Sequence, residues 1–300
     1  TLGGRWNEDL PLQRKPGGSG DRGPGSSARR NAHKGRPSGA RLHDARSDHG
    51  ARERARRDEV RAFLRADRLV RAARVGELAP ILNPPAIWAA AANYKAHQAE
   101  MQAKMGSSDR SNLSKDELMA EFFLKPASSI IGPGGPVILP KISKDVDFEC
   151  ELCAVIGKTA RHVGEEQALD HVFGYTILWD FSQRDPWGRG RQNTRNIRKG
   201  FDTFTGLGPW IVTRDEIDDP QNLAIRVEQN GKPAMSAHTG DMICTLREHI
   251  RFLSDVTTLM PGVLITTGTP AGVAKLADGD HLKGGIEKIG EMEVEVRAER

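Results

Sequence analysis

The chain has 300 residues, enough for a domain that buries a sizeable core without disulfide or metal support. It contains no run of about eighteen apolar residues and no basic-then-apolar signal pattern, so we expect neither a membrane span nor secretion. Three cysteines are too few, and odd in number, for a disulfide framework. A reducing compartment, the cytoplasm, is therefore predicted.

Positive charge is concentrated at the start of the chain. The net charge is +4, but residues 1–80 hold 19 Lys and Arg against 10 Asp and Glu, whereas the remainder holds 25 against 30. Residues 1–50 mix Gly, Pro, Ser and Arg with few apolar residues, and helical spacing appears only over 51–74. We predict a poorly structured basic extension over 1–80 and a catalytic domain over 81–300.

A basic extension of this kind has two readings. It could bind nucleic acid electrostatically, with the rest of the chain an idle scaffold. It lacks both a recognisable nucleic-acid motif and aromatic residues interleaved with the charges. We therefore favour a disordered extension, and nucleic acid is the lesser alternative as a partner.

Beyond residue 81, short β-type runs alternate with Gly and Pro, and helical spacing is limited to a few segments. The expected strands are 86–92, 137–139, 148–156, 173–179, 210–213, 223–229, 263–267 and 291–297. The expected helices are 96–105, 115–122, 165–171 and 245–257. Strands and helices do not alternate regularly, which favours a mainly β member of the α+β class.

Two acidic residues stand out in the segment DVDFECELCAVIG, residues 145–157. Read as a strand, it places Glu149 and Glu151 on one face with Cys153 and Val155. Two neighbouring carboxylates on a core strand repel each other and need a cation to compensate. The alternative is an edge strand with a solvated face.

The same strand carries Cys150 and Cys153 in C-x-x-C spacing. An odd separation sends the two sulfur atoms to opposite faces of a strand. No second C-x-x-C exists, so a zinc or redox pair is rejected and the cysteines are expected to fill the core.

A third acid, Asp180, ends the apolar run VFGYTILWD, so it is expected at a strand end. Together with Glu149 and Glu151 it would give an all-oxygen site of the kind that suits Mg²⁺, Mn²⁺ or Ca²⁺. Upstream, His97 and Glu100 would share one face of a helical turn, where the carboxylate could raise the basicity of the imidazole. Taken singly, Asp180 could be a cap or a partner of Arg184, and the His-x-x-Glu pair could be a solvated helix face.

Two further segments offer groups that bind anions. Lys199 lies in RNIRKGFDTF, where it could equally be a solvated lysine. In TTGTPAGV, the backbone N–H groups of Gly268 and Thr269 and the Thr269 hydroxyl could hold a carboxylate, or the segment could be only a turn.

The order of these segments resembles the fumarylacetoacetate hydrolase family. The resemblance extends over roughly 87–296 and rests on several blocks in family order: NYKAHQAEM, FLKPASSIIGPGGPVILP, DFECELCAVIGKTARHV, GYTILWDFSQRD, KGFDTFTGLGPWIVT and LMPGVLITTGTPAGV. It implies a mixed β-sheet rolled into a barrel-like core, usually assembled as a homodimer.

The resemblance also implies roles for individual residues. The metal ligands of the family fall on Glu149, Glu151 and Asp180, with Mg²⁺ the expected ion. The water-activating pair and the active-site lysine fall on His97, Glu100 and Lys199. The substrate-binding residues fall on Arg184, Gly268 and Thr269. The segment 102–121 is expected to be a lid.

The implied activity is metal-dependent cleavage of a carbon–carbon bond in an acylpyruvate such as fumarylpyruvate, through an enolate held by the metal. Decarboxylation, isomerisation, tautomerisation and hydration of related 2-oxo acids are alternatives that the motifs do not separate. One departure concerns Trp187, where many hydrolases of the family have Gln. The loop that follows carries Arg189, Arg191, Arg195 and Arg198, which could bind an anionic substrate tail or simply be solvated.

Overall fold

The computed structural model describes residues 78–106, 109–110, 112–186 and 194–300, and every structural statement below concerns these residues. Almost all of the basic extension, the expected helix over 51–74, Trp187, Arg189 and Arg191 lie outside the described residues. Within the described part, no helix is long and apolar enough to cross a membrane.

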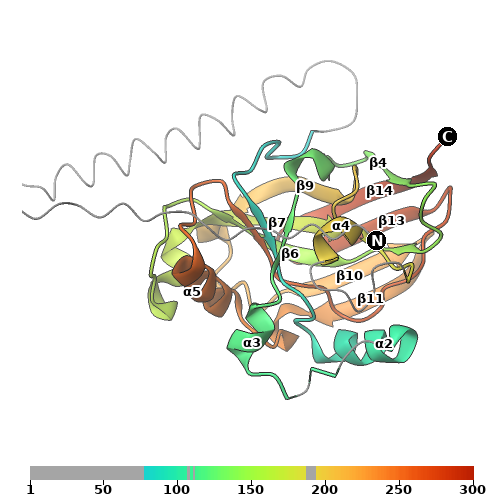
Figure 1. Ribbon diagram of the computed structural model, residues 1–300. Helices are drawn as coiled ribbons and strands as arrows, with labels where there is room; N and C mark the ends of the chain where they lie inside the picture. The colour runs from blue at the N-terminus through green and yellow to red at the C-terminus, as the bar shows by residue number, and fades with distance from the viewer. Residues whose placement is uncertain (1–77, 107–108, 111, 187–193) are drawn as a thin grey trace, which may run out of the picture. The chain divides into compact units, whose positions relative to one another are not determined.

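Among the described residues, strands hold more of the chain than helices do, and they form three sheets (Figure 1). The larger mixed sheet has the order β2-β1-β12-β6-β7-β9-β3. Its strands are β1 (Ile87–Ala89), β2 (Phe123–Lys125), β3 (Ile130–Ile131), β6 (Cys150–Ile156), β7 (Val172–Asp180), β9 (Thr205–Thr213) and β12 (Leu264–Thr266). The second sheet has the order β11-β10-β13-β14-β4, and a two-stranded sheet pairs β5 with β8. Their strands are β4 (Pro136–Leu139), β5 (Val146–Asp147), β8 (Ser182–Gln183), β10 (Ala224–Gln229), β11 (Lys232–His238), β13 (His281–Ile286) and β14 (Gly290–Ala298).

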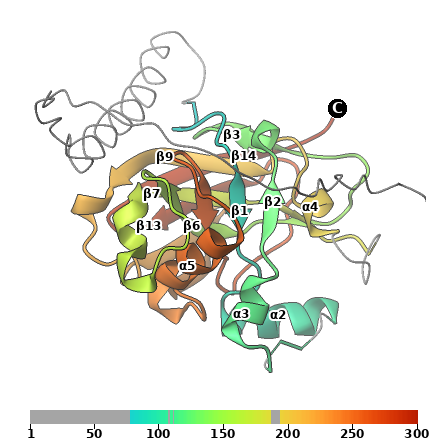
Figure 2. The ribbon, with the colours of Figure 1, turned by 60° about the vertical axis from the view of Figure 1, so that its left-hand side comes forward.

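Helices are few and short. They are α2 (Lys95–Met105), α3 (Lys115–Met119), α4 (Arg195–Arg198) and α5 (Leu246–Val256), with 3₁₀ turns at Ala127–Ser129, Glu165–His171, Arg214–Glu216 and Thr239–Asp241. Ser114 and Thr245 begin α3 and α5 through capping boxes, which satisfy the first backbone N–H groups. Both views show α2 and α3 side by side at one end of the strands (Figures 1 and 2).

The main core lies between the two larger sheets. Leu152 and Ile177 of the first sheet and Leu282 and Val294 of the second belong to one buried cluster. A second, smaller cluster covers the opposite face of the first sheet and includes Cys153. Strand β6 therefore has apolar neighbours on both faces, as expected for a central strand.

These features confirm the predicted α+β, mainly β architecture with a mixed sheet. All eight expected strands are present with shifted ends, and three of the four expected helices form. The fourth, over 165–171, is a 3₁₀ helix rather than an α-helix. The three cysteines are free and buried, and Cys150 and Cys153 belong to different core clusters, as their odd spacing predicts.

Candidate active site

Strand register brings the acidic residues together. Strands β6 and β7 are antiparallel with Cys150 opposite Trp179, so Glu149 and Asp180 are the next pair along. The Asp180 N–H donates to the Glu149 carbonyl at 2.8 Å. All seven residues of β6 are buried between β12 and β7, so the edge-strand alternative for Glu149 and Glu151 is wrong.

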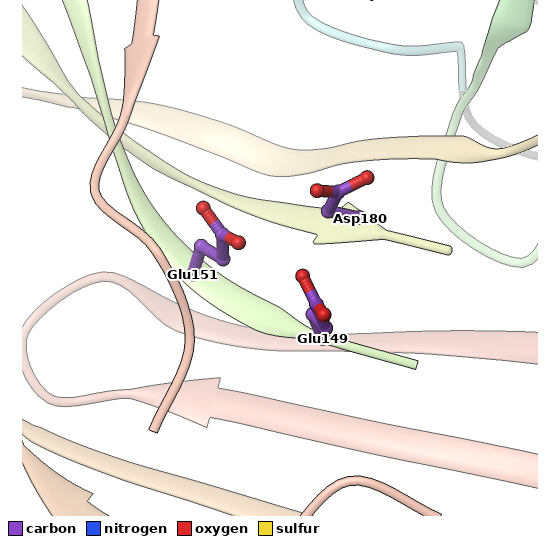
Figure 3. Close-up of side chains that lie close together, drawn as sticks. All are labelled: Glu149, Glu151 and Asp180. Atoms are coloured by element: carbon purple, nitrogen blue, oxygen red, sulfur yellow. The ribbon is translucent and has the colours of Figure 1, made fainter. Parts of the chain in front are cut away.

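The carboxylates of Glu149, Glu151 and Asp180 converge on one small volume (Figure 3). One oxygen from each lies within 4.8 Å of the others. Glu149 is 5% exposed, whereas Glu151 and Asp180 are fully buried. Three carboxylate oxygens at this spacing can bind one hard divalent cation and leave its remaining positions to water or substrate.

The state of Glu151 agrees with a cation site. Its burial, together with the charges of Asp180 and Glu149, raises its pKa well above the ordinary value. Its Oε2 accepts hydrogen bonds from the Thr266 hydroxyl and, at 2.8 Å, from the Gly268 N–H. Its Oε1 is buried with no hydrogen-bond partner among the described residues. A divalent ion would use that oxygen and reverse the repulsion, so the residues fit such an ion.

Two lysines approach the same carboxylates. Lys199 Nζ lies 2.6 Å from Glu149 Oε2 and 2.5 Å from Asp180 Oδ2. Lys125, from β2, contacts the other oxygen of Asp180 at 2.6 Å and donates to the Lys199 carbonyl at 2.5 Å. Asp180 is thus held between two buried ammonium groups, and one of them also anchors the backbone of Lys199.

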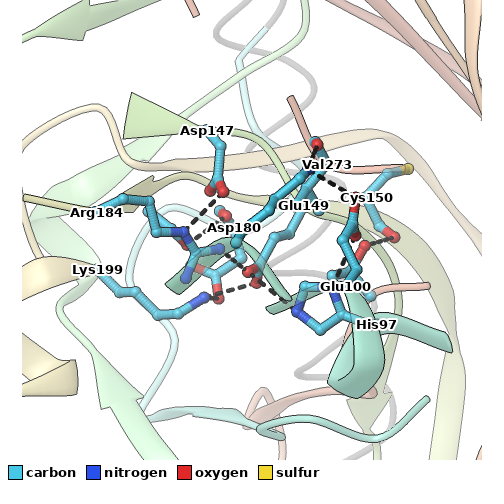
Figure 4. A network of polar contacts seen from close by, with 12 residues as sticks. His97, Glu100, Asp147, Glu149, Cys150, Asp180, Arg184, Lys199 and Val273 are labelled. Atoms are coloured by element: carbon cyan, nitrogen blue, oxygen red, sulfur yellow. Dashed lines mark hydrogen bonds and ion pairs between the residues drawn. The ribbon is translucent and has the colours of Figure 1, made fainter. Parts of the chain in front are cut away.

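Arg184 is held by two carboxylates next to this group (Figure 4). Its Nε donates to Asp147 at 2.7 Å, and its Nη2 donates to Glu149. Asp147 ends β5, which pairs with β8, and Arg184 follows β8 directly. This pairing brings Asp147 close to Arg184. Although burial opposes ionisation, the charges of Lys199 and Arg184 hold the pKa of Glu149 well below its usual range.

His97 and Glu100 lie on α2 and face the carboxylates. His97 Nδ1 is 3.5 Å from Glu100, longer than a normal hydrogen bond, and its Nε2 is 3.8 Å from Glu149. Burial tends to raise the pKa of Glu100, but the neighbouring His97 ring and the hydrogen bonds from Lys104 and the Gly272 N–H hold it at about 2. Glu100 is therefore an anion that can orient the imidazole and stabilise its protonated form.

The Gly-Thr-Pro segment follows β12 and closes the site from another side. Gly268 has a φ of +83°, and a Cβ there would approach Asn93 Cβ to 3.0 Å, so glycine suits this position. This turn directs the Gly268 N–H at Glu151 and places Thr269, which is 2% exposed, in the wall of a cavity.

That cavity, of about 100 Å³, is lined by residues that lie far apart in the chain, from Ala90 to Thr269. Its wall contains five of the nine residues that the sequence predicts for the site: His97, Glu149, Arg184, Lys199 and Thr269. The other four lie next to these residues. Glu100 is beside His97, and Glu151 and Asp180 converge with Glu149. The Gly268 N–H donates to Glu151. The structure thus brings all nine together.

Two residues of the network were not predicted from the sequence, namely Lys125 and Asp147. Asp147 could have been predicted from the sequence, because it continues the alternation of Glu149 and Glu151 with a spacing of two. For Lys125, the sequence offers only its position in the FLKP block. The wall also contains Arg110, which lies in the expected lid segment, and Arg195 and Arg198 of the basic loop.

Comparisons with known proteins show the family to which the chain belongs. Residues 86–297 match the family model described as fumarylacetoacetate (FAA) hydrolase, C-terminal. A maleylpyruvate hydrolase of Aquipseudomonas alcaligenes is 39% identical over 222 residues, 74% of this chain and 75% of that protein. An oxaloacetate tautomerase of Xenopus laevis is 38% identical over 220 residues, 71% of this chain and 66% of that protein.

Solved structures give the same assignment. The maleylpyruvate hydrolase of Sphingobium sp. SYK-6, in complex with manganese(II) and pyruvate, superposes with a TM-score of 0.63 at 36% identity, covering 83% of this chain and 86% of that one. A 5-carboxymethyl-2-hydroxymuconate delta-isomerase from Mycobacterium smegmatis gives 0.63 at 35% identity, covering 74% and 80%. With the family model matching most of the chain, this protein belongs to the fumarylacetoacetate hydrolase family.

Proposed function

We propose that this protein is a metal-dependent hydrolase that cleaves a carbon–carbon bond in an acylpyruvate, a 2,4-dioxo acid of which fumarylpyruvate is an example. The observation that carries the proposal is the position of His97, which lies between the anionic Glu100 and the metal-binding carboxylate Glu149. A base held in this way, beside a cation site, is what activation of a water molecule requires.

Each group then has a defined task. A divalent ion at Glu149, Glu151 and Asp180 would supply Lewis acidity to the 2-oxo acid end of the substrate, with Mg²⁺ expected and Mn²⁺ or Ca²⁺ as alternatives. Arg184 and Thr269 bind the substrate carboxylate and fix its orientation. His97 takes a proton from water, and Glu100 stabilises the imidazolium that forms.

The reaction adds water across one carbon–carbon bond. The hydroxyl group goes to the distal acyl carbon, the bond between that carbon and the pyruvate methylene breaks, and the proton goes to the methylene carbon. Lys199 stabilises negative charge that develops on oxygen during these steps. The products are pyruvate and the free acid of the acyl group.

A second outcome at the same site is tautomerisation, isomerisation, decarboxylation or hydration of a related 2-oxo acid. The similarity of this chain to an oxaloacetate tautomerase and to an isomerase supports this second candidate function. These reactions need the cation site and the substrate carboxylate site, but the proton-transfer steps that they require do not all involve an attacking water.

Turnover assays separate the candidates. Purified protein is incubated with a panel of acylpyruvates and with oxaloacetate, in Mg²⁺, Mn²⁺ or EDTA. We expect metal-dependent release of pyruvate from acylpyruvates. Faster conversion of oxaloacetate than of every acylpyruvate would favour the second candidate, and turnover of neither class would overturn both. The homodimer and the cytoplasmic location remain predictions.

A further inference from the structure

The wall of the active-site cavity includes a group of arginines that the proposed reaction does not use. Three guanidinium groups line it: Arg110, Arg195 and Arg198. With Arg184 and Lys199, the wall holds five cationic side chains and one carboxylate, that of Glu149. Asp147, Asp180 and Glu121 pair with several of these cations but do not line the cavity, so the wall presents mainly N–H donors to a bound molecule.

Glu121 holds two of these arginines together. Arg110 Nε lies 3.0 Å from Glu121 Oε1, and Arg195 Nη2 lies 2.9 Å from its Oε2. Arg195 Nη1 also donates to the Glu121 carbonyl at 2.9 Å. Glu121 is about half buried; its burial opposes ionisation, but the two guanidinium groups hold its pKa below the usual value.

These contacts join three separate segments of the chain. Arg110 lies between α2 and α3, Glu121 follows α3, and Arg195 begins α4. Each guanidinium group has five N–H donors, and the Arg195 contacts with Glu121 use only part of this capacity. The remaining donors of Arg195 are available for a second acceptor.

The distance to the reaction centre can be bounded through one aromatic ring. Phe123, which also lines the cavity, has Lys199 Nζ 5.1 Å and Arg195 Cζ 5.8 Å from its ring centroid. The two cations are therefore at most about 11 Å apart, the sum of these distances. An acyl chain a few carbon atoms long can reach from one cation to the other.

We propose that Arg110 and Arg195, held by Glu121, form a distal carboxylate-binding site that selects substrates with a second carboxylate at the acyl end. Arg184 and Thr269 then bind the carboxylate at the 2-oxo acid end, and the two carboxylate-binding sites together recognise a dianion. This assignment rests on the proposed function for the orientation of the substrate. Glu121 is a positioning residue, because it acts through the two arginines.

The test uses a pair of ligands that cannot undergo the proposed cleavage because they lack a 4-oxo group. 2-Oxoheptanedioate and 2-oxoheptanoate have the same chain length and differ only in a terminal carboxylate. Their dissociation constants are measured by calorimetry on Mg²⁺-loaded protein. We expect the diacid to bind about 10- to 100-fold more tightly, the range for a charge-assisted hydrogen bond.

Substitutions test which residues cause the tighter binding of the diacid. Arg195→Ala and Arg110→Ala should each weaken diacid binding about 10-fold or more and leave monoacid binding within about twofold. Arg195→Lys should restore part of the difference, since it keeps the charge but loses the planar fork. Arg251→Ala is the matched control, because Arg251 pairs with Asp116 and does not line the cavity. Circular dichroism confirms that each variant is folded.

Glu121→Gln tests the positioning role. It keeps both arginines but loosens them, so the diacid preference should fall while monoacid binding stays constant. Equal binding of the two ligands to the unaltered protein would overturn the proposal, as would a parallel loss of both in the arginine variants. Because neither ligand is cleaved, these outcomes are distinct from failure of the proposed hydrolase activity, which appears only as absent turnover of acylpyruvates.

Discussion

The ammonium group of Lys199 lies 2.6 Å from the carboxylate of Glu149, although the two side chains are only 7% and 6% exposed. This ion pair joins the end of α4 to the beginning of β6, two segments that the chain separates by 50 positions. Glu149 also accepts from Arg184, so its charge is compensated by protein groups. Glu151, one residue beyond Cys150 on the same strand, has no such cationic partner among the described residues.

Because Glu149 has cationic partners and Glu151 has none among the described residues, replacing each by Gln should affect stability differently. In EDTA, Glu149→Gln should lower the free energy of unfolding by about 1–3 kcal/mol, because Lys199 and Arg184 lose a charged partner. Glu151→Gln should leave stability unchanged or raise it, since a buried carboxylate that is repelled by its neighbours becomes neutral. Urea unfolding of both variants measures this; equal destabilisation would contradict the assignment.

Added metal should stabilise the unaltered protein more than either Glu variant. Binding of Mn²⁺ to the native state alone raises the melting temperature of the unaltered protein in a concentration-dependent way. Both Glu variants lack one of three anionic ligands, so each should lose most of that increase and most of its metal-dependent turnover. Normal metal binding by either variant would show that the ion is bound elsewhere.

Replacement of His97 by Ala separates the base from the metal site. Metal binding should stay within a few-fold of normal, because His97 is not one of the three converging carboxylates. Acylpyruvate hydrolysis should fall about 10²- to 10⁴-fold, the usual contribution of a general base. Oxaloacetate decarboxylation should fall less, since it needs no activated water. Unchanged hydrolysis in this variant would exclude His97 as the base.

The predictable part of the site is the part that strand periodicity controls. The alternation along residues 148–156 predicts two faces, and the structure places Cys150 and Cys153 in different core clusters accordingly. The apolar run before Asp180 predicts a strand end, and β7 ends there. Local spacing likewise predicts that His97 and Glu100 share a face of α2.

The unpredicted part depends on contacts between distant segments. Lys125 meets Asp180 across 55 positions, and Arg184 meets Asp147 across 37. Such pairs follow from sheet register, which a single sequence specifies only weakly for strands as short as β2 and β5. The helix α4 has only four residues, too few to give a periodic pattern, so the position of Lys199 at its end also had to come from the structure.

Lys125 gives a prediction about stability. Both Lys125 and Asp180 have side chains that are 0% exposed. Lys125→Met should lower the free energy of unfolding by about 3 kcal/mol, because it leaves Asp180 with one cationic partner instead of two. In the double variant Lys125→Met, Asp180→Asn, the combined loss should be smaller than the sum of the two single losses by about 0.5–3 kcal/mol. Additive losses would show that the pair is not coupled.

The last prediction concerns acid stability and lies away from the metal site. His249 on α5 is 1% exposed, its ring packs edge-on against Phe122 at 5.0 Å, and its Nδ1 has no hydrogen-bond partner among the described residues. Burial lowers its pKa to about 3, with opposing charge effects from Glu248 and Lys115. In the unfolded chain a histidine titrates near 6.5.

Between these two pKa values the unfolded state binds a proton that the native state does not, so the free energy of unfolding falls as the pH falls through this window. Between pH 7 and pH 5 the loss from His249 should be about 2 kcal/mol. His249→Phe keeps the ring packing and removes the titration, so its loss over the same interval should be smaller by about that amount. Urea unfolding of the unaltered protein and of the His249→Phe variant at the two pH values measures this difference, and an equal loss in the His249 variant would show that this buried imidazole does not control acid stability.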